Sequence, residues 1–341
     1  MGQRITPSRF TVIIALLAAA AVVSMAACLF IGAADISVAR VWNALLGEGS
    51  DADRAIVFSR LARGFAALIA GGALSLAGAV SQTVLRNPLA DPYVLGISGS
   101  AGLGAILAGL IAGSTASASM SLFALPAAVF AVGAVALILA VQARFPRLGL
   151  EGLILLGVMI NAFCGAAIVA ATAMFNQNEL MTYFRWMLGS LSVIPYGPGD
   201  LLPVGGLTLL VLVILMLLSR RMNALLLRPD EARSMGVEVE KLQRLSLFAC
   251  AIATAGAVAL AGMVGFVGLL IPHAARRLFG GDMRLLLPAS ALLGGAALVI
   301  ADAVARSIMR PSELPVGVIT AVVGAPALVF ILISRSKGGE R

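Results

Sequence analysis

The chain has 341 residues, of which 60% are hydrophobic and only 12% are charged, and its mean hydropathy is +1.04. This composition excludes a soluble enzyme, a disordered protein, a coiled coil and a disulfide scaffold, because a soluble fold cannot bury so much apolar surface. The net charge of +8 comes mainly from arginine, and in a membrane protein such an excess orients the chain instead of binding nucleic acid. The sequence therefore predicts an all-α polytopic membrane protein.

Runs without charged residues predict the membrane-spanning helices, since each crossing needs about 20 apolar residues. The runs cover residues 11–34, 64–85, 92–143, 152–178, 201–219, 245–272, 285–301 and 314–334. The first run is interpreted as an uncleaved helix, because it is longer than the apolar part of a signal peptide and further spans follow it. The third run contains a turn-like stretch of small residues at 113–119 and therefore predicts two helices.

The run at 245–272 allows two interpretations, either one tilted helix or a helix followed by a short one after Gly262, Gly265 and Gly268. The first gives nine crossings and divides the 24 arginine and lysine residues almost equally between the two membrane faces. The second gives ten crossings and places most of these residues in the cytoplasm, as the positive-inside rule requires. We therefore expect one transmembrane domain over residues 1–341, with about ten helices and both termini cytoplasmic.

The interiors of the predicted spans contain no Asp, Glu, Lys or Arg near their middle. Ion-coupled secondary transporters usually keep ionisable groups there, so this class of protein is disfavoured. Glycine and alanine dominate instead, which predicts close helix packing. Cys28, Cys164 and Cys250 lie far apart in apolar runs and are interpreted as core residues, and His273 is the one histidine, too few for a zinc site. No metal or cofactor site is predicted.

The segment 86–107 contains two prolines that break the helix at the membrane edge. Non-helical backbone is tolerated there only against protein or along a water-filled path. Ordinary turn chemistry is one explanation. The segment is unusually long and apolar for a turn, so a role in lining a transport path is the competing explanation.

The longest charged segment, residues 220–244, lies on the predicted cytoplasmic side. Residues 229–237 within it have the marks of a short helix, with Pro229 at the start, two acidic residues in the first turn and Gly236 at the stop. Such a helix is either a solvated connector or a docking element for a partner. The chain has no Gly-Lys-Ser/Thr phosphate-binding loop, so ATP hydrolysis would require a separate subunit.

Five blocks of sequence carry a family resemblance: NPLADPYVLGIS, DEARSMGV, GFVGLLIPHAARRLFG, LLLPASALLGGAALVIADAVAR and ELPVGVITAVVGAPALVFIL. In this order they resemble the permease subunits of FecCD-type (type II) ABC importers for iron-siderophores, haem and cobalamin, from about Arg60 to Leu332. The resemblance implies ten helices per subunit and a permease dimer, expected to be a homodimer, around a central path. It also implies two cytoplasmic ATPase subunits that bind the ATP, a periplasmic binding protein, and a location in the bacterial inner membrane. The chain itself is not expected to be an enzyme.

The resemblance also assigns roles on the cytoplasmic side. The short helix matches the family's coupling helix, which contacts the ATPase, and its matching residues are Asp230, Glu231, Arg233, Ser234, Met235 and Gly236. Family members usually begin this helix with Gly-Glu-Glu, whereas this chain has Arg228, Pro229 and Asp230. Asn87 and Leu89 match positions that form a cytoplasmic gate in cobalamin-type members.

On the periplasmic side, arginines of the family meet glutamates of the binding protein. The candidates here are Arg60, Arg63, Arg306 and Arg310. Ala62 replaces the proline that is usual between the first two. The alternative role for each arginine is an anchor at the membrane interface. The candidates for lining the path form a mixed apolar and polar wall: Met159, Asn161, Met174, Phe175, Asn176 and Gln177.

The resulting prediction is the permease subunit of an ABC importer for an iron chelate or a tetrapyrrole. The alternatives are an oxyanion importer of the same family, such as one for molybdate, an ion-coupled secondary transporter, or a membrane scaffold. Siderophore, haem and cobalamin are not distinguished, because the periplasmic protein recognises them. His273 lies in a block that is general to the family, so haem ligation by this residue is not expected.

Overall fold

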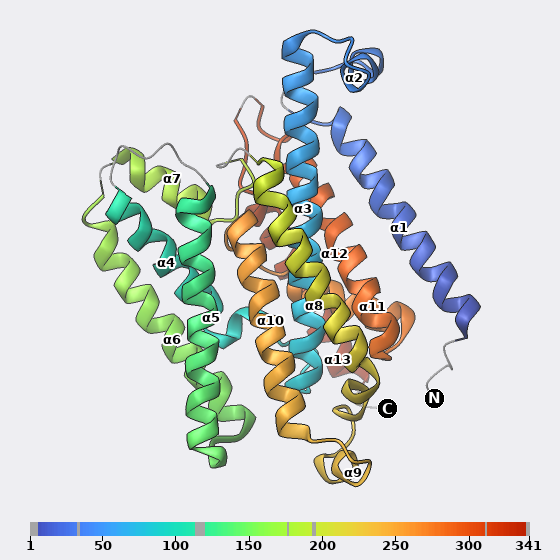
Figure 1. Cartoon of the computed structure of the whole chain (residues 1–341), viewed down its shortest axis with the longest axis vertical. Helices are drawn as coiled ribbons and strands as arrows, with labels where there is room; N and C mark the ends of the chain where they lie inside the picture. Colours follow the sequence, from blue (N-terminus) through green and yellow to red (C-terminus); the bar gives the residue numbers. More distant parts are fainter. Residues whose placement is uncertain are drawn as a thin grey trace.

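Figure 1 shows the computed structural model of the chain. It describes residues 6–32, 35–112, 120–175, 177–192, 196–310 and 312–338, and the predicted turn at 113–119 lies outside them. Regular structure in the described residues is all helical. The α-helices are α1 (Pro7–Phe30), α2 (Val38–Leu45), α3 (Asp51–Val84), α4 (Ile97–Ala112), α5 (Met120–Arg144), α6 (Gly149–Thr172), α7 (Gln177–Met187), α8 (Pro198–Ala224), α9 (Pro229–Ser234), α10 (Val239–Ala261), α11 (Val267–Phe279), α12 (Met283–Ala305) and α13 (Val316–Gly338). Two 3-10 helices are η1 (Pro92–Leu95) and η3 (Pro146–Leu148).

Among the described residues, eight helices are long and apolar enough to cross a membrane: α1, α3, α5, α6, α8, α10, α12 and α13. The shorter apolar helix α4 packs on α5, and the 13-residue α11 packs on α3. A crossing by each of these two would give the ten helices that the charge distribution predicts, and this number stays a prediction. In Figure 1, α9 and the start of α1 lie at the lower end of the bundle, and α2 lies at the upper end. The lower end is therefore the cytoplasmic one.

The chain breaks between α10 and α11 at Gly262. This residue has φ +68°, a conformation that L side chains rarely adopt. A Cβ at this position would lie 2.0 Å from the carbonyl oxygen of Trp186, so the close approach also requires glycine. The interpretation of residues 245–272 as a helix followed by a short one is therefore confirmed.

The helix α3 forms the centre of the bundle, and α10, α11 and α12 pack around it (Figure 1). All its residues from 71 to 84 are buried. A Cβ on Gly71 would lie 2.2 Å from the carbonyl oxygen of Gly294, and a Cβ on Gly78 would lie 1.6 Å from that of Gly268. The close packing that the glycines predict is therefore confirmed, since the backbones of neighbouring helices touch.

One added methyl group at such a contact should disturb the bundle. We expect Gly78→Ala to lower the free energy of unfolding by about 1–3 kcal/mol, because the backbone of α11 must move away. The matched control is Gly206→Ala on α8, where no atom lies within 4 Å of the added Cβ. Unfolding of the purified variants in detergent measures the effect, and equal stability of the two variants would contradict the backbone contact.

Candidate coupling site, gate and arginine cluster

The helix α9 is stabilised at both ends by residues of its own segment. The backbone at Arg228 is extended, and its N–H donates to Oε2 of Glu231 at 3.1 Å. Pro229 fits the first helical position, and the acidic side chains lie at the positive end of the helix dipole. Gly236, at φ +76°, turns the chain toward α10. The predicted short helix is confirmed, and it ends at Ser234.

One side of α9 packs against the bundle and the other side faces outward. Ala232 on the packed side is buried, whereas Met235, directly after the helix, is 66% exposed. The guanidinium group of Arg233 lies 2.5 Å from Oε1 of Glu240 on α10 and 3.4 Å from Oδ1 of Asp230. The hydrogen bond to Glu240 raises the pKa of Arg233 above its usual value. These contacts attach α9 to the start of α10, so a partner that pushes on α9 also pushes on a membrane helix.

A polar contact that the sequence analysis missed holds the end of α8, just before α9. Nδ2 of Asn223 donates to Oδ1 of Asp282 at 3.0 Å, and Oδ1 of Asn223 accepts from the backbone N–H of Met283 at 2.8 Å. Hydrogen bonds from Arg284 lower the pKa of Asp282 to about 2. Its stabilising effect is complete above about pH 4 and is lost as the pH falls through the lowered pKa. The signal in the sequence is the Asp directly before α12, at a helix N-cap.

The predicted gate residues lie in the turn that follows α3. Oδ1 of Asn87 accepts a hydrogen bond from the backbone N–H of Leu89 at 2.9 Å. The carbonyl oxygen of Asn87 accepts one from the backbone N–H of Ala90, also at 2.9 Å. Arg86, at φ 50°, donates from Nε to the carbonyl oxygen of Leu225 at 2.9 Å. Asn87 is exposed and Leu89 is half-buried. The turn thus contacts the end of α8, from which α9 follows, and its gating role stays a prediction.

The side chain of Asn161 on α6 is used within the protein. Its Nδ2 donates to the carbonyl oxygen of Tyr93 at 3.0 Å, and its Oδ1 accepts from the backbone N–H of Gly99 at 2.9 Å. These bonds fix the junction of η1 and α4 against α6. The structure therefore gives Asn161 a positioning role, which depends on the course of the loop before α4 and has no signal in the sequence.

The other predicted path residues lie along and just after α6. Met159 and Met174 are 59% and 75% exposed, so they are available to line a path or face a partner. Phe175 is half-buried and stacks on Tyr183, with 6.2 Å between the ring centroids. Asn176 and the side chain of Gln177 lie outside the described part of the chain.

The predicted docking arginines Arg63 and Arg306 are buried in an ion cluster. Arg63 lies 2.8 Å from Oδ1 of Asp302 and 2.7 Å from Oε2 of Glu313, and Arg306 lies 3.0 Å from Oδ2 of Asp302. The side chains of Arg63 and Arg306 are 11% and 4% exposed. Acidic partners inside the protein hold both guanidinium groups in this structure, and their docking role stays a prediction.

The remaining two docking candidates differ in exposure. Arg60 is 6% exposed, and its Nη1 donates to the carbonyl oxygen of Leu29 at 2.6 Å. The side chain of Arg310 is 41% exposed and pairs with Asp35 at 2.8 Å, and the side chain of Asp35 is 89% exposed. Of the four arginines, Arg310 is the one whose guanidinium group an external protein can reach.

The three cysteines and the histidine lie in the protein interior. Cys28, Cys164 and Cys250 are free and buried, as expected of core residues, and His273 is 3% exposed. Within the residues that the structure describes, no group of three or more His, Cys, Asp or Glu side chains is placed to hold a metal ion.

The helix bundle, with eight apolar spans among the described residues and an exposed charged helix at one end, defines a multi-pass membrane protein. The chain belongs to the FecCD transport family, which it matches over residues 15–334. It is 34% identical over 311 residues to the hemin transport system permease protein HmuU of Yersinia pestis, covering 90% of both chains. It is 35% identical over 328 residues to the ferric enterobactin transport system permease protein FepD of Escherichia coli, covering 93% of this chain and 94% of the relative.

A solved structure of another protein has the same fold as this chain. It is described as a metal-chelate type ABC transporter in an inward-facing conformation, and it superposes with a TM-score of 0.81 at 29% identity, covering 95% of this chain and 99% of that one. The predicted fold class, the FecCD family and the role as an ABC importer permease of the bacterial inner membrane are confirmed. The relatives give no support to the oxyanion alternative.

Proposed function

We propose that an iron chelate or a tetrapyrrole enters the cytoplasm through a path built by two copies of this chain. A periplasmic binding protein delivers the substrate at the end near α2, and two ATPase subunits act on α9 at the other end. The support for the substrate class is that the relatives described above are named for hemin and ferric enterobactin transport. The support for the dimer is the family resemblance, and α6 and α13 are among the helices whose apolar side chains are exposed and open to a second copy.

The observation that carries the proposal is the connection from α9 to the gate turn. The exposed helix is tied to α10 by Arg233 and Glu240. Leu225 directly follows α8, and its carbonyl oxygen accepts a hydrogen bond from Nε of Arg86, the residue before the gate residue Asn87. A movement of α9 driven by an ATPase subunit therefore has a direct mechanical route to the cytoplasmic end of the path.

The test is uptake into proteoliposomes that contain the chain, its ATPase subunit and its binding protein. Haem, a ferric siderophore, cobalamin and molybdate are compared with and without ATP. ATP-dependent uptake of one of the first three supports the proposal. Uptake of molybdate alone would overturn the substrate class, and uptake without ATP would overturn the coupling through α9.

The gate assignment predicts thiol reactivity that depends on the nucleotide. In the assembled importer, cysteines introduced by Asn87→Cys and Leu89→Cys should react several-fold faster in one nucleotide state than in the other, because a gate opens and closes around them. The native cysteines are buried and give little background. The control is Ser8→Cys at the exposed start of α1, whose reactivity should stay constant. Constant rates at 87 and 89 would show that the turn is passive.

A further inference from the structure

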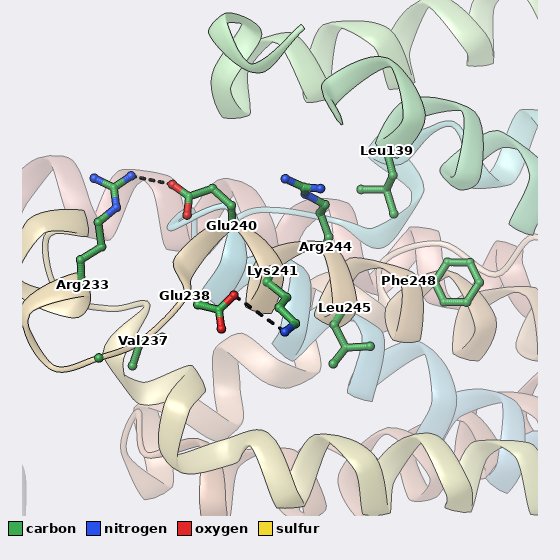
Figure 2. Close-up of a pocket in the computed structure, with 10 residues that line it drawn as sticks. Leu139, Arg233, Val237, Glu238, Glu240, Lys241, Arg244, Leu245 and Phe248 are labelled. Carbon is green, nitrogen blue, oxygen red and sulfur yellow. Dashed lines mark hydrogen bonds and ion pairs between the residues drawn. The ribbon is translucent and has the colours of Figure 1, made fainter. Parts of the chain in front are cut away.

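An open groove lies beside α9, between α10 and α5, with a volume of about 950 Å³ (Figure 2). Its two ends differ in chemistry. Charged side chains from α9 and the first turns of α10 surround one end, and apolar side chains of α10 and α5 line the other. The coupling role of α9 does not account for the apolar end.

At the charged end, two ion pairs are complete and one cation is left over. Arg233 pairs with Glu240 at 2.5 Å and Lys241 pairs with Glu238 at 3.8 Å, as the dashed lines in Figure 2 show. Arg244 follows Glu240 by one turn and is exposed. It interacts electrostatically with Glu240, whose carboxylate already pairs with Arg233, and no hydrogen bond or ion pair within the described residues holds its guanidinium group. Three cations thus face two carboxylates, and both carboxylates are already paired.

At the apolar end, hydrophobic side chains are left open. Leu245 and Phe248 are 45% and 38% exposed, and Leu139 of α5 lies across the groove from them (Figure 2). Exposing such side chains to water is unfavourable, so this end suits a hydrocarbon chain. Leu137 of α5 and Phe145, which directly follows this helix, are each 57% exposed, as expected where a helix faces lipid.

The position of the groove along α10 matches the polar layer of a bilayer. This helix starts at Val239 at the cytoplasmic end. At 1.5 Å per residue, Arg244 lies about 7.5 Å and Phe248 about 13.5 Å further into the bundle. Arg244 is also the last charged residue before the apolar run 245–272, which sets it at the edge of the hydrocarbon core. The headgroup layer on each side of the hydrocarbon core is roughly 5–8 Å thick. A phosphate at Arg244 would therefore place its acyl chain beside Phe248.

We propose that this groove binds an anionic glycerophospholipid of the cytoplasmic leaflet. Its phosphate pairs with Arg244, and one acyl chain lies on Leu245, Phe248 and Leu139. A lipid is the occupant because the unpaired cation and the open apolar surface lie in one groove at headgroup depth. The anionic class is preferred because the three cations of the groove exceed its two carboxylates by one, and each carboxylate already has an ion-pair partner. The bound lipid contacts α5 and the start of α10 beside α9, so the position of α9 becomes sensitive to the membrane composition.

The test uses the full chain with a fluorophore in the groove. Trp42 is replaced by Phe, and Phe248→Trp introduces a tryptophan at the apolar end, while the native Trp186, only 2% exposed, stays as a constant reference. The protein in detergent is titrated with phosphatidylglycerol and with phosphatidylcholine that carry the same brominated acyl chains. We expect phosphatidylglycerol to quench the introduced tryptophan at about fivefold lower concentration, because one cation near a membrane surface gives roughly this gain in affinity.

Charge reversals then locate the headgroup. Arg244→Glu should abolish the preference for phosphatidylglycerol, whereas Arg220→Glu, at an exposed arginine of α8 outside the groove, should keep it. Equal quenching by both lipids, or no quenching by either, would overturn the proposal. A preference that both reversals reduce equally would also overturn it, since the attraction would then belong to the whole cytoplasmic surface. The emission of Trp186 reports that each variant is folded.

Discussion

The double change Ser234→Arg with Met235→Glu on α9 is expected to reduce substrate-stimulated ATP hydrolysis by on the order of a hundredfold, while the chain still inserts and folds. The bundle tolerates the change because Met235 is 66% exposed and the hydroxyl of Ser234 donates, at 2.7 Å, to the carbonyl oxygen of Glu231 in its own helix. A partner interface does not tolerate it, since changes at a central contact residue cost about 2–4 kcal/mol of binding.

The measurement is ATP hydrolysis by the assembled importer with its loaded binding protein. The control is Leu278→Glu at the end of α11, a side chain 67% exposed near the contact of Asn223 with Asp282 and thus at the same end of the bundle. Normal stimulation in the α9 variant would contradict the coupling role. An equal loss in the control would attribute the effect to added charge on the cytoplasmic face.

The membrane architecture could be predicted because its signals are local or additive. The composition of a run such as 152–178 is enough to predict a membrane-spanning helix. The distribution of arginines favoured ten such helices over nine. The break at Gly262 was predicted from the glycines, although its cause, the approach to the carbonyl oxygen of Trp186, is a contact between distant segments. The short helix α9 was predicted because a proline, two acids and a glycine mark its ends within eight residues.

The arginine cluster could not be predicted because its partners are far away in the sequence. Arg63 and Asp302 are 239 positions apart, and Arg63 and Glu313 are 250 apart. The apolar run 285–301 stops just before Asp302, whereas α12 continues through this residue to Ala305. Family resemblance gave the arginines an external partner, but the fold supplies an internal one.

Removing the shared carboxylate should therefore be costly. Asp302→Asn is expected to lower the free energy of unfolding by about 3–5 kcal/mol, because two buried guanidinium groups lose their common counter-charge. Asp302 itself is 1% exposed, so water cannot replace it. Unfolding in detergent by heat or denaturant gives the measurement. The control is Asp35→Asn in the exposed pair with Arg310, which should change stability by less than about 1 kcal/mol.

The same reasoning decides how docking of the binding protein has to be tested. Arg63→Glu with Arg306→Glu would place two further negative charges beside Asp302, so we expect the folded chain to be lost and any loss of docking to be secondary. Arg310→Glu changes a guanidinium group that is accessible, and it should slow association with the binding protein several-fold at low salt and less at high salt. Unchanged association at low salt, measured on a variant of normal stability, would exclude Arg310 from the docking surface.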